Sequence, residues 1–207
     1  MTTVSKLWPG ETAVLLGCGP SLTREDVESV RGKARVIAIN TSHELAPWAD
    51  VLYSSDLGWW RQVNGAPGFT GLKYAVHSGT GRLWKLWPDV QVLANTGTDG
   101  LELKPHGLRT IRNSGGAAIN LAMHFGARRI LLLGYDMGRR GRQAHWFGDH
   151  PNPLRNASPY AEFMASFATM VKPLRTQGVT VLNCSRETAL RCFQRATLAD
   201  ALSTAVA

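Results

Sequence analysis

Long apolar segments are missing from this 207-residue sequence. Residues 130–133, one of the most apolar stretches, are far fewer than the roughly 20 residues that a membrane-spanning helix needs. Residues 1–6 contain no apolar core of a secretory signal peptide. Hydrophobic residues still make up 44% of the chain and charged residues 18%, which is the composition of a folded domain and excludes disorder. We therefore expect a cytoplasmic protein that does not contact a membrane.

Cysteine is also scarce. Cys18, Cys184 and Cys192 are odd in number and lack the spacing of metal ligands, so we interpret them as reduced and mostly buried thiols. Cys18 lies in a glycine-rich turn. There a small residue packed beneath the turn is favoured over the alternative of a reactive thiol.

Acidic residues are few relative to basic ones. Asp and Glu number 15 against 23 Lys and Arg, which gives a net charge of +8. This excess indicates an acidic partner, either nucleic acid or a phosphorylated small substrate. The densest basic run, residues 139–142, lies in a predicted loop, where a solvated face is the alternative interpretation.

Apolar runs alternate with helical patterns along the chain. Strands are predicted at 14–16, 34–40, 50–56, 129–134 and 179–183, with weaker candidates at 74–77 and 90–93. Helices are predicted at 24–31, 114–125 and 159–177 and from 196 onward. The alternation predicts an α/β fold with a mostly parallel sheet covered by helices on both faces. We expect a single domain over 1–207, in which the loop-rich stretch 58–104 could hold an insertion or lid.

A glycine turn joins the first predicted strand to the first helix. Its residues are Gly17, Cys18, Gly19, Pro20 and Ser21. Glycines allow the backbone to approach a ligand closely, and the first N–H groups of the following helix carry a partial positive charge. The pattern predicts a phosphate cradle to which Ser21 adds a hydroxyl donor. The alternative is a helix that simply packs closely on the sheet.

Polar residues follow the other strands and mark one helix start. They are Asn40, Asp56 and Asp136 after strands, and Asn113, Ser114, Gly115 and Gly116 at the helix over 114–125, for which Ser114 is the predicted N-cap. Ligands of open parallel sheets bind beyond the carboxyl ends of the strands. Together these residues predict one nucleotide-sized site with a second anion cradle at the helix start. Each residue alone also suits a plain loop or a capped helix.

These motifs carry a family resemblance. The glycine turn, Asn40, the run that begins at Asn113 and the strand end at Asp136 resemble successive motifs of a Rossmann-like superfamily. That superfamily includes bacterial CMP-sialic-acid-using sialyltransferases, motility-associated flagellin glycosylation factors and archaeal 6-hydroxymethylpterin diphosphokinase. The resemblance covers residues 12–56 and 110–190. By its size and its segment 145–160, the chain also resembles small proteins of tailed bacteriophages, which implies the cytoplasm of a host cell.

The resemblance implies a Rossmann-like fold and a role for each motif. The glycine turn would contact the phosphate, Asn40 the ribose or sugar, and Ser114 with Gly115 the nucleotide. The sialyltransferases usually have a donor-contacting asparagine where this chain has Cys18. The resemblance therefore points away from CMP-sialic acid itself and toward another nucleotide conjugate.

A loop with two histidines follows the strand that ends at Asp136. It contains His145, Asp149 and His150. Imidazole titrates near neutral pH, so a histidine beside a carboxylate is suited to act as general base toward an acceptor hydroxyl. The sialyltransferases likewise use a late histidine as base, and His145 or His150 corresponds to it by position. The alternatives are a divalent metal site completed by Asp56 or Asp136, and a packed loop with surface histidines.

The leading interpretation is a nucleotide-conjugate-dependent transferase. It would be a glycosyltransferase with a nucleotide-sugar donor as substrate and no assigned cofactor, and nucleic acid is one candidate acceptor, as in phage DNA modification. The second interpretation is a pterin-type diphosphokinase whose Mg²⁺ would be held by Asp56 and Asp136. The third is a non-catalytic phage accessory protein that binds nucleotide or DNA. The sequence leaves the oligomeric state open.

Overall fold

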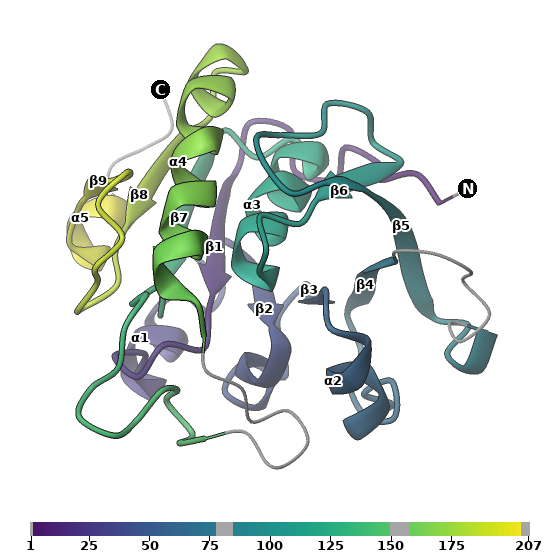
Figure 1. Cartoon of the computed structure of the whole chain (residues 1–207), viewed down its shortest axis with the longest axis horizontal. Helices are drawn as coiled ribbons and strands as arrows, with labels where there is room; N and C mark the ends of the chain where they lie inside the picture. Colours follow the sequence, from purple (N-terminus) through teal and green to yellow (C-terminus); the bar gives the residue numbers. More distant parts are fainter. Residues whose placement is uncertain (1, 78–84, 150–157, 204–207) are drawn as a thin grey trace.

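The computed structural model describes residues 2–77, 85–149 and 158–203, and its strands form one parallel sheet. The strand order is β6-β5-β4-β3-β2-β1-β7-β8-β9. The strands are β1 Thr12–Leu16, β2 Arg35–Ile39, β3 Val51–Ser54, β4 Leu72–His77, β5 Val90–Gly97, β6 Gly107–Arg109, β7 Arg129–Leu133, β8 Thr180–Asn183 and β9 Gln194–Arg195. The helices are α1 Arg24–Ser29, the 3₁₀ helix η1 Asn40–Glu44, α2 Leu57–Gln62, α3 Ser114–Phe125, α4 Tyr160–Thr176 and α5 Leu198–Ser203 (Figure 1).

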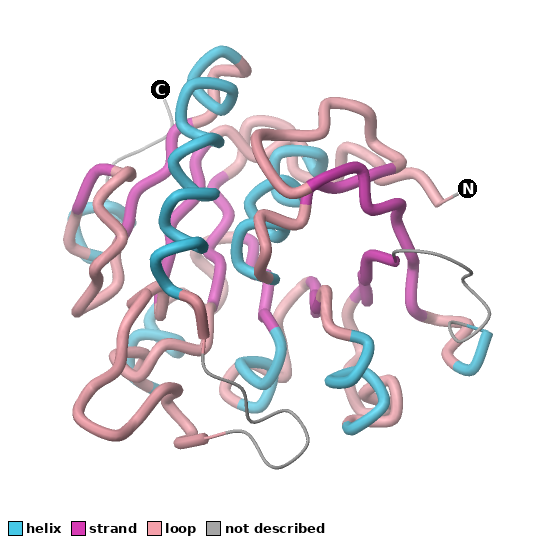
Figure 2. The backbone as a smooth tube through the Cα atoms, viewed as in Figure 1, coloured by secondary structure: helices cyan, strands magenta, loops and turns pink. Residues whose placement is uncertain are grey.

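Side chains alternate along each strand and fill two cores, one on each face of the sheet. In β1, Ala13 and Leu15 belong to the core beneath α3 and α4. Val14 and Leu16 belong to the core that α1, α2 and α5 help to form. Figure 2 shows α3 and α4 running side by side across one face of the strands. Burial on both faces explains why β1 and β7 consist of continuous apolar runs.

The predicted α/β, Rossmann-like fold is confirmed, and the sheet is parallel throughout its nine strands. The weaker strand candidates at 74–77 and 90–93 are β4 and β5. Four short elements were not predicted, namely η1, α2, β6 and β9. Strands of two or three residues are too short to show a periodic pattern. None of the helices in the described ranges is long and apolar enough to span a membrane.

The stretch 58–104, where the sequence suggests an insertion or lid, contributes strands to the body of the sheet. β4 pairs with β3, with Tyr53 opposite Tyr74, and β5 pairs with β4, with Ala75 opposite Val92. α2 packs Trp59 and Trp60 into the core below β3. Residues 78–84 of this stretch lie outside the described residues.

Candidate functional site

The strand order reverses direction between β1 and β7. From β1 the chain builds outward through β2 to β6, and it then returns to add β7, β8 and β9 on the other side. Loops that leave the carboxyl ends of β1 and β7 therefore diverge, and ligands of open parallel sheets bind at such a point. The glycine turn follows β1 and Asp136 follows β7, so two predicted site segments meet here.

The glycine turn is bound tightly to the end of β7. Gly17 N–H donates to Leu133 O at 2.8 Å, and Gly19 N–H donates to Gly134 O at 2.8 Å. A Cβ atom added at Gly17 would lie 2.5 Å from Gly134 O, and one at Gly19 would lie 2.3 Å from Asp136 Oδ1. Glycine is therefore required at both positions by contact with the protein itself, and these two N–H groups already have acceptors.

Asp136 holds the end of this turn. Ser21 donates twice to its carboxyl group, from N–H to Oδ2 at 2.7 Å and from the hydroxyl to Oδ1 at 2.8 Å. Asp136 is only 6% exposed. Burial raises the pKa of its carboxyl group, and the two hydrogen bonds from Ser21 oppose that shift. The hydroxyl that the sequence offers to a ligand thus donates to Asp136 instead, which corrects that expectation.

Cys18 points into the protein. Its Sγ donates to Ile39 O at 3.2 Å and lies 3.3 Å from Ser42 Oγ, while Ser42 Oγ donates to Gly17 O at 2.5 Å. Burial raises the pKa of the Cys18 thiol to about 11. The thiol is therefore protonated near neutral pH and packs beneath the turn, and it is not an activated nucleophile.

Asn40, at the end of β2 beside this turn, has a polar side chain with unused hydrogen-bonding capacity. It follows β2 directly and has a left-handed backbone, with φ at 51°. Its Oδ1 atom is buried, and no hydrogen-bond donor reaches it within the described part of the chain. A buried carbonyl oxygen without a donor is costly, so this atom is suited to accept a hydrogen bond from a ligand.

Several residues other than glycine around this edge have a left-handed backbone conformation. Ile111 and Arg112, with φ at 47° and 57°, precede α3, and Met137, with φ at 50°, follows Asp136. Such conformations are uncommon for branched or bulky residues and often mark functional sites. Sequence reasoning did not identify these three residues, because composition carries no signal for a strained backbone.

α3 spans the predicted residues 114–125, but its N-cap lies one residue earlier than predicted. Asn113, not Ser114, is the N-cap, and its side chain accepts from Gly116 N–H at 3.0 Å. A Cβ atom at Gly116 would lie 2.4 Å from Ile111 Cβ, so this glycine is required by packing. The Ser114 hydroxyl oxygen instead accepts from Ser55 N–H at 3.0 Å.

Tyr135 connects the start of α3 to the end of β7. Its hydroxyl donates to Gly115 O at 3.0 Å, and a Cβ atom at Gly115 would lie 2.9 Å from Tyr135 Cε1. Because Tyr135 precedes Asp136 in the chain, α3, the β7 end and the glycine turn form one connected unit. Tyr53 and Ser55, whose hydroxyl oxygens are 2.8 Å apart, add further polar groups beside α3 that the sequence reasoning missed.

The two carboxylates considered for Mg²⁺ have separate structural tasks. Asp56 caps α2, with Oδ1 accepting from Gly58 N–H at 2.7 Å and from Trp59 N–H at 3.3 Å. Both oxygens of Asp136 accept from Ser21. Across the residues that the structure describes, no group of three His, Cys, Asp or Glu side chains is arranged to hold a metal ion. Both carboxylates are therefore engaged by donors of the protein itself.

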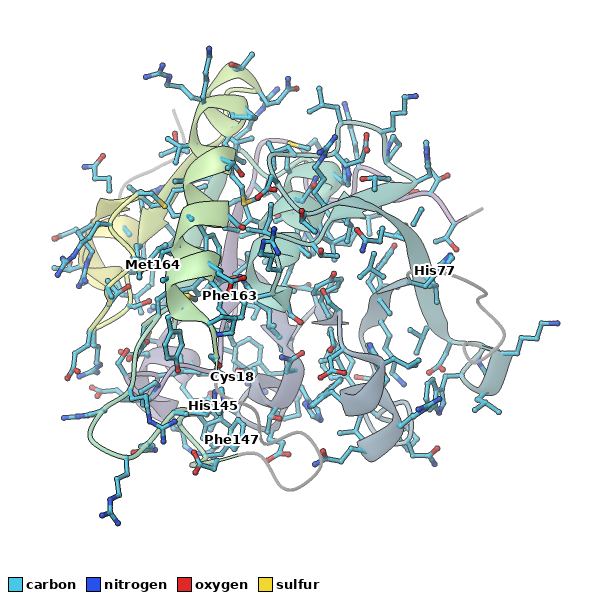
Figure 3. The ribbon with its side chains drawn as sticks, in the orientation of Figure 1. Cys18, His77, His145, Phe147, Phe163 and Met164 are labelled. Atoms are coloured by element: carbon cyan, nitrogen blue, oxygen red, sulfur yellow. The ribbon has the colours of Figure 1, made fainter. Side chains whose placement is uncertain are left out.

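The loop that contains His145 lies against the glycine turn. Trp146 N–H donates to Cys18 O at 3.1 Å, and the Trp146 side chain packs against the core on the α1 side. His145 stacks on Phe147, with ring centroids 5.1 Å apart and an interplanar angle of 10°. Figure 3 shows Cys18, His145 and Phe147 together below the first turns of α4. His150 lies outside the described residues.

The basic run at 139–142 is partly neutralised. Arg139 lies 3.5 Å from Asp149, the carboxylate predicted to accompany the catalytic histidine, and Arg140 lies 3.7 Å from Glu187. Asp149 therefore contacts an arginine. His145 stacks on Phe147, and its backbone pairs with that of Gly148.

The fold and the polar edge together define a Rossmann-like α/β protein with a candidate ligand site at the switch point between β1 and β7. Its fold is similar to that of the sialyltransferase CstII from Campylobacter jejuni, determined in complex with the substrate analogue cytidine-5'-monophosphate. The TM-score is 0.56 at 14% sequence identity, over 95% of this chain and 88% of that one. At this identity the likeness shows the fold.

Other comparisons add no assignment. A short-chain dehydrogenase/reductase from Serratia marcescens matches 86% of this chain and 74% of its own at 16% identity, but the TM-score of 0.26 carries no argument. No protein-family model matches the sequence, and no curated protein matches it.

Proposed function

We propose that this protein is a nucleotide-conjugate-dependent transferase of the glycosyltransferase type, with His145 as general base. The observation that carries the proposal is the hydrogen bond from Trp146 N–H to Cys18 O, which holds the histidine loop against the turn after β1. An imidazole is thereby kept beside the edge at which sheets of this kind bind nucleotides. The likeness of the fold to a sialyltransferase that was crystallised with a nucleotide supports the same reading.

The donor phosphate is assigned to the start of α3. In the glycine turn the N–H groups of Gly17, Gly19 and Ser21 already donate within the protein. The first N–H groups of a helix lack intrahelical acceptors and carry a partial positive charge. α3 is 12 residues long, so Ser114 and Gly115 are suited to contact the phosphate.

The nucleoside or sugar is assigned to the edge beside β2. Asn40 Oδ1 is buried without a donor from the described chain, and a ribose or sugar hydroxyl would supply one. The Ser114 hydroxyl accepts from Ser55, and its own hydrogen is directed by whatever acceptor lies nearby, such as a phosphate oxygen.

The proposed reaction needs one proton transfer and one displacement. His145 accepts the proton of an acceptor hydroxyl, and that oxygen forms a bond to the activated sugar carbon. The bond between this carbon and the phosphate oxygen breaks, and the nucleotide leaves with the bonding electron pair. The partial positive charge at the start of α3 stabilises the negative charge that develops on the leaving phosphate.

A ligand screen and one variant pair test this proposal. Nucleotides and nucleotide sugars based on cytidine, uridine, guanosine and adenosine are compared by thermal shift, each with and without Mg²⁺. A ligand at about 100 times its dissociation constant adds about 2.7 kcal/mol of stability, which is a readily measured shift. Stabilisation by a nucleotide or its sugar conjugate without metal supports the transferase and identifies the donor class.

The contrary outcomes are distinct. Stabilisation only by ATP with Mg²⁺ would favour the diphosphokinase, and no shift with any nucleotide would favour a protein without turnover. With the donor known, His145→Ala is expected to lower turnover about 100-fold or more while leaving donor binding unchanged. The control is His106→Ala in the loop before β6, which is expected to retain full activity. Unchanged turnover in His145→Ala would remove the base assignment.

A further inference from the structure

Positive charge gathers at the amino-terminal edge of the sheet, opposite the candidate site. The loops that enter β2, β7 and β8 carry Arg31, Lys33 and Arg35, then Arg128 and Arg129, then Arg175 at the end of α4. These strands are parallel and are separated in the sheet only by β1, so their entry loops share one edge. In Figure 1 this is the edge at which α4 ends.

Backbone contacts connect these loops. Arg128 N–H donates to Glu11 O at 3.1 Å, just before β1, and Thr180 N–H at the start of β8 donates to Arg128 O at 2.9 Å. Neighbouring strands lie about 4.8 Å apart, so the basic residues at these strand entries form a row along one edge, which Glu11 before β1 interrupts between β2 and β7. We call this row of six basic residues the basic edge.

The acidic residues at this edge are already paired. Arg35 contacts Glu11 at 2.8 Å and Asp50 at 3.3 Å, and Arg31 contacts Glu28 at 3.6 Å. For Lys33, Arg128 and Arg175, no carboxylate of the described chain lies within 4.0 Å. The basic edge therefore keeps a net positive charge, whereas the carboxyl edge places Glu187 and Asp149 beside its arginines.

A cavity opens at one end of the basic edge. It has a volume of about 450 Å³, and Arg31, Lys33, Arg35 and Trp48 line it together with Glu11 and Asp50, the two carboxylates that pair with Arg35. The Arg31 guanidinium lies over the Trp48 ring, 5.4 Å from its centroid. The volume is within the range of small-ligand pockets, and the wall combines an aromatic ring with three cations, of which only Arg35 is paired with the two lining carboxylates.

This combination matches single-stranded nucleic acid. A row of cations binds successive phosphates, and aromatic or guanidinium planes stack on an unpaired base. A duplex would use the cations, but its bases remain stacked on one another and could not reach Trp48. A base-free polyanion would likewise use only the cations.

We propose that the basic edge is a binding site for single-stranded nucleic acid, with one base in the cavity beside Trp48 and the phosphates along the row toward Arg175. The site lies at the opposite end of the strands from the candidate active site, and it does not depend on the proposed transferase activity. Binding of a polyanion at the basic edge would also account for the net charge of +8, for which the carboxyl edge, with its paired arginines, does not account.

The test measures the affinity of the full chain for a fluorescein-labelled single-stranded oligonucleotide by anisotropy between 50 and 200 mM salt. If about four phosphates are neutralised, a plot of the logarithm of the affinity against the logarithm of the salt concentration should have a slope of about −3. The double variant Lys33→Glu and Arg175→Glu should weaken binding about tenfold or more and make the slope shallower. Both residues are exposed, so the variant tests binding without disturbing the core.

Two comparisons make the result decisive. Arg140→Glu with Arg142→Glu makes the same change of charge on the opposite edge, and it is expected to weaken binding by less than about threefold. Trp48→Leu should weaken binding to the oligonucleotide about tenfold while leaving binding to heparin, a polyanion without bases, unchanged.

The proposal is overturned by any of three results. The first is no measurable oligonucleotide binding at 50 mM salt. The second is an equal loss in the Lys33 and Arg175 variant and in the Arg140 and Arg142 control, which would mean that only overall charge matters. The third is binding of heparin as tight as that of the oligonucleotide with no effect of Trp48→Leu on either.

Discussion

Removing the Asp136 carboxylate should separate the glycine turn from the end of β7. The carboxyl group accepts the Ser21 N–H at 2.7 Å and the Ser21 hydroxyl at 2.8 Å, and it is 6% exposed. In Asp136→Ala both donors lose their acceptor in a buried position. Hydrogen bonds to a charged group are each worth about 1.5–3 kcal/mol, so we expect the loss of both to cost about 3–6 kcal/mol.

Asp136→Asn is the matched variant, because it keeps the shape and can keep both contacts. The amide oxygen can accept the Ser21 N–H, and the amide NH₂ can donate to the Ser21 hydroxyl oxygen, whose hydrogen is free to rotate. We therefore expect a loss of only about 1 kcal/mol. The contrast between alanine and asparagine separates the hydrogen bonds from the negative charge.

The pH dependence of stability adds a second readout. Burial raises the pKa of Asp136 in the folded state above its value in the unfolded chain. The folded protein thus binds this proton more readily, so the contribution of Asp136 to stability rises as the pH falls through the folded pKa and is complete below the unfolded pKa. Asp136→Asn cannot titrate and should lack this contribution.

Urea unfolding followed by circular dichroism measures all three effects. With a denaturant slope of about 2.5 kcal/mol per M, Asp136→Ala should lower the midpoint by about 1.5 M and Asp136→Asn by about 0.4 M. An Asp136→Ala protein within about 0.5 kcal/mol of the parent would refute the assignment of Asp136 as the clamp of the turn. So would an asparagine variant as unstable as the alanine variant.

Three further outcomes are expected. Gly19→Ala should destabilise the fold by about 1–3 kcal/mol in the same assay, because its Cβ would lie 2.3 Å from Asp136 Oδ1. The control is Gly68→Ala, whose Cβ would have nothing within 4 Å and which should be neutral. Equal stabilities of the two variants would contradict the packing argument. Burial lowers the pKa of His124, so the unfolded chain takes up the proton at higher pH than the folded chain does, and stability should fall as the pH drops below about 6.5. His124→Gln should flatten this trend. A stability difference between the variant and the parent that does not change with pH would disprove the reasoning. Because the pKa of Cys18 is raised from 9.0 to about 11, its thiolate fraction at pH 8 is about 100-fold lower, and Ellman's reagent should modify it only on unfolding; rapid modification of the native protein would show that the thiol is accessible.

Periodicity and local turn signals were sufficient for most of the fold. Apolar runs identified β1, β2, β3, β7 and β8, and the helix predicted from residue 24 begins there as α1, where Thr23 Oγ1 accepts from Asp26 N–H at 3.1 Å. These signals are local because strands and helix starts depend on neighbouring residues. α2 was missed because its six residues are too few to show a helical period, and its two buried residues, Trp59 and Trp60, are adjacent in sequence.

The candidate site was predicted as a set of segments but not as a set of contacts. Gly17, Gly19, Asn40 and Asp136 were recognised because polar and glycine residues follow strand ends, and parallel strands bring those ends together. The left-handed conformation of Ile111 could not be foreseen, since a branched residue has no intrinsic preference for it.

Composition and pattern alone determined the fold class, the edge of the sheet where the candidate site lies and the excess of basic residues. Tertiary structure alone decided which groups remain available there. It committed Ser21 to Asp136, buried the Cys18 thiol against Ile39 O and left Asn40 Oδ1 without a donor in the described chain. The physical reason is that a hydrogen bond between residues as far apart in sequence as 21 and 136 depends on how the strands are ordered, and no local pattern encodes that distance.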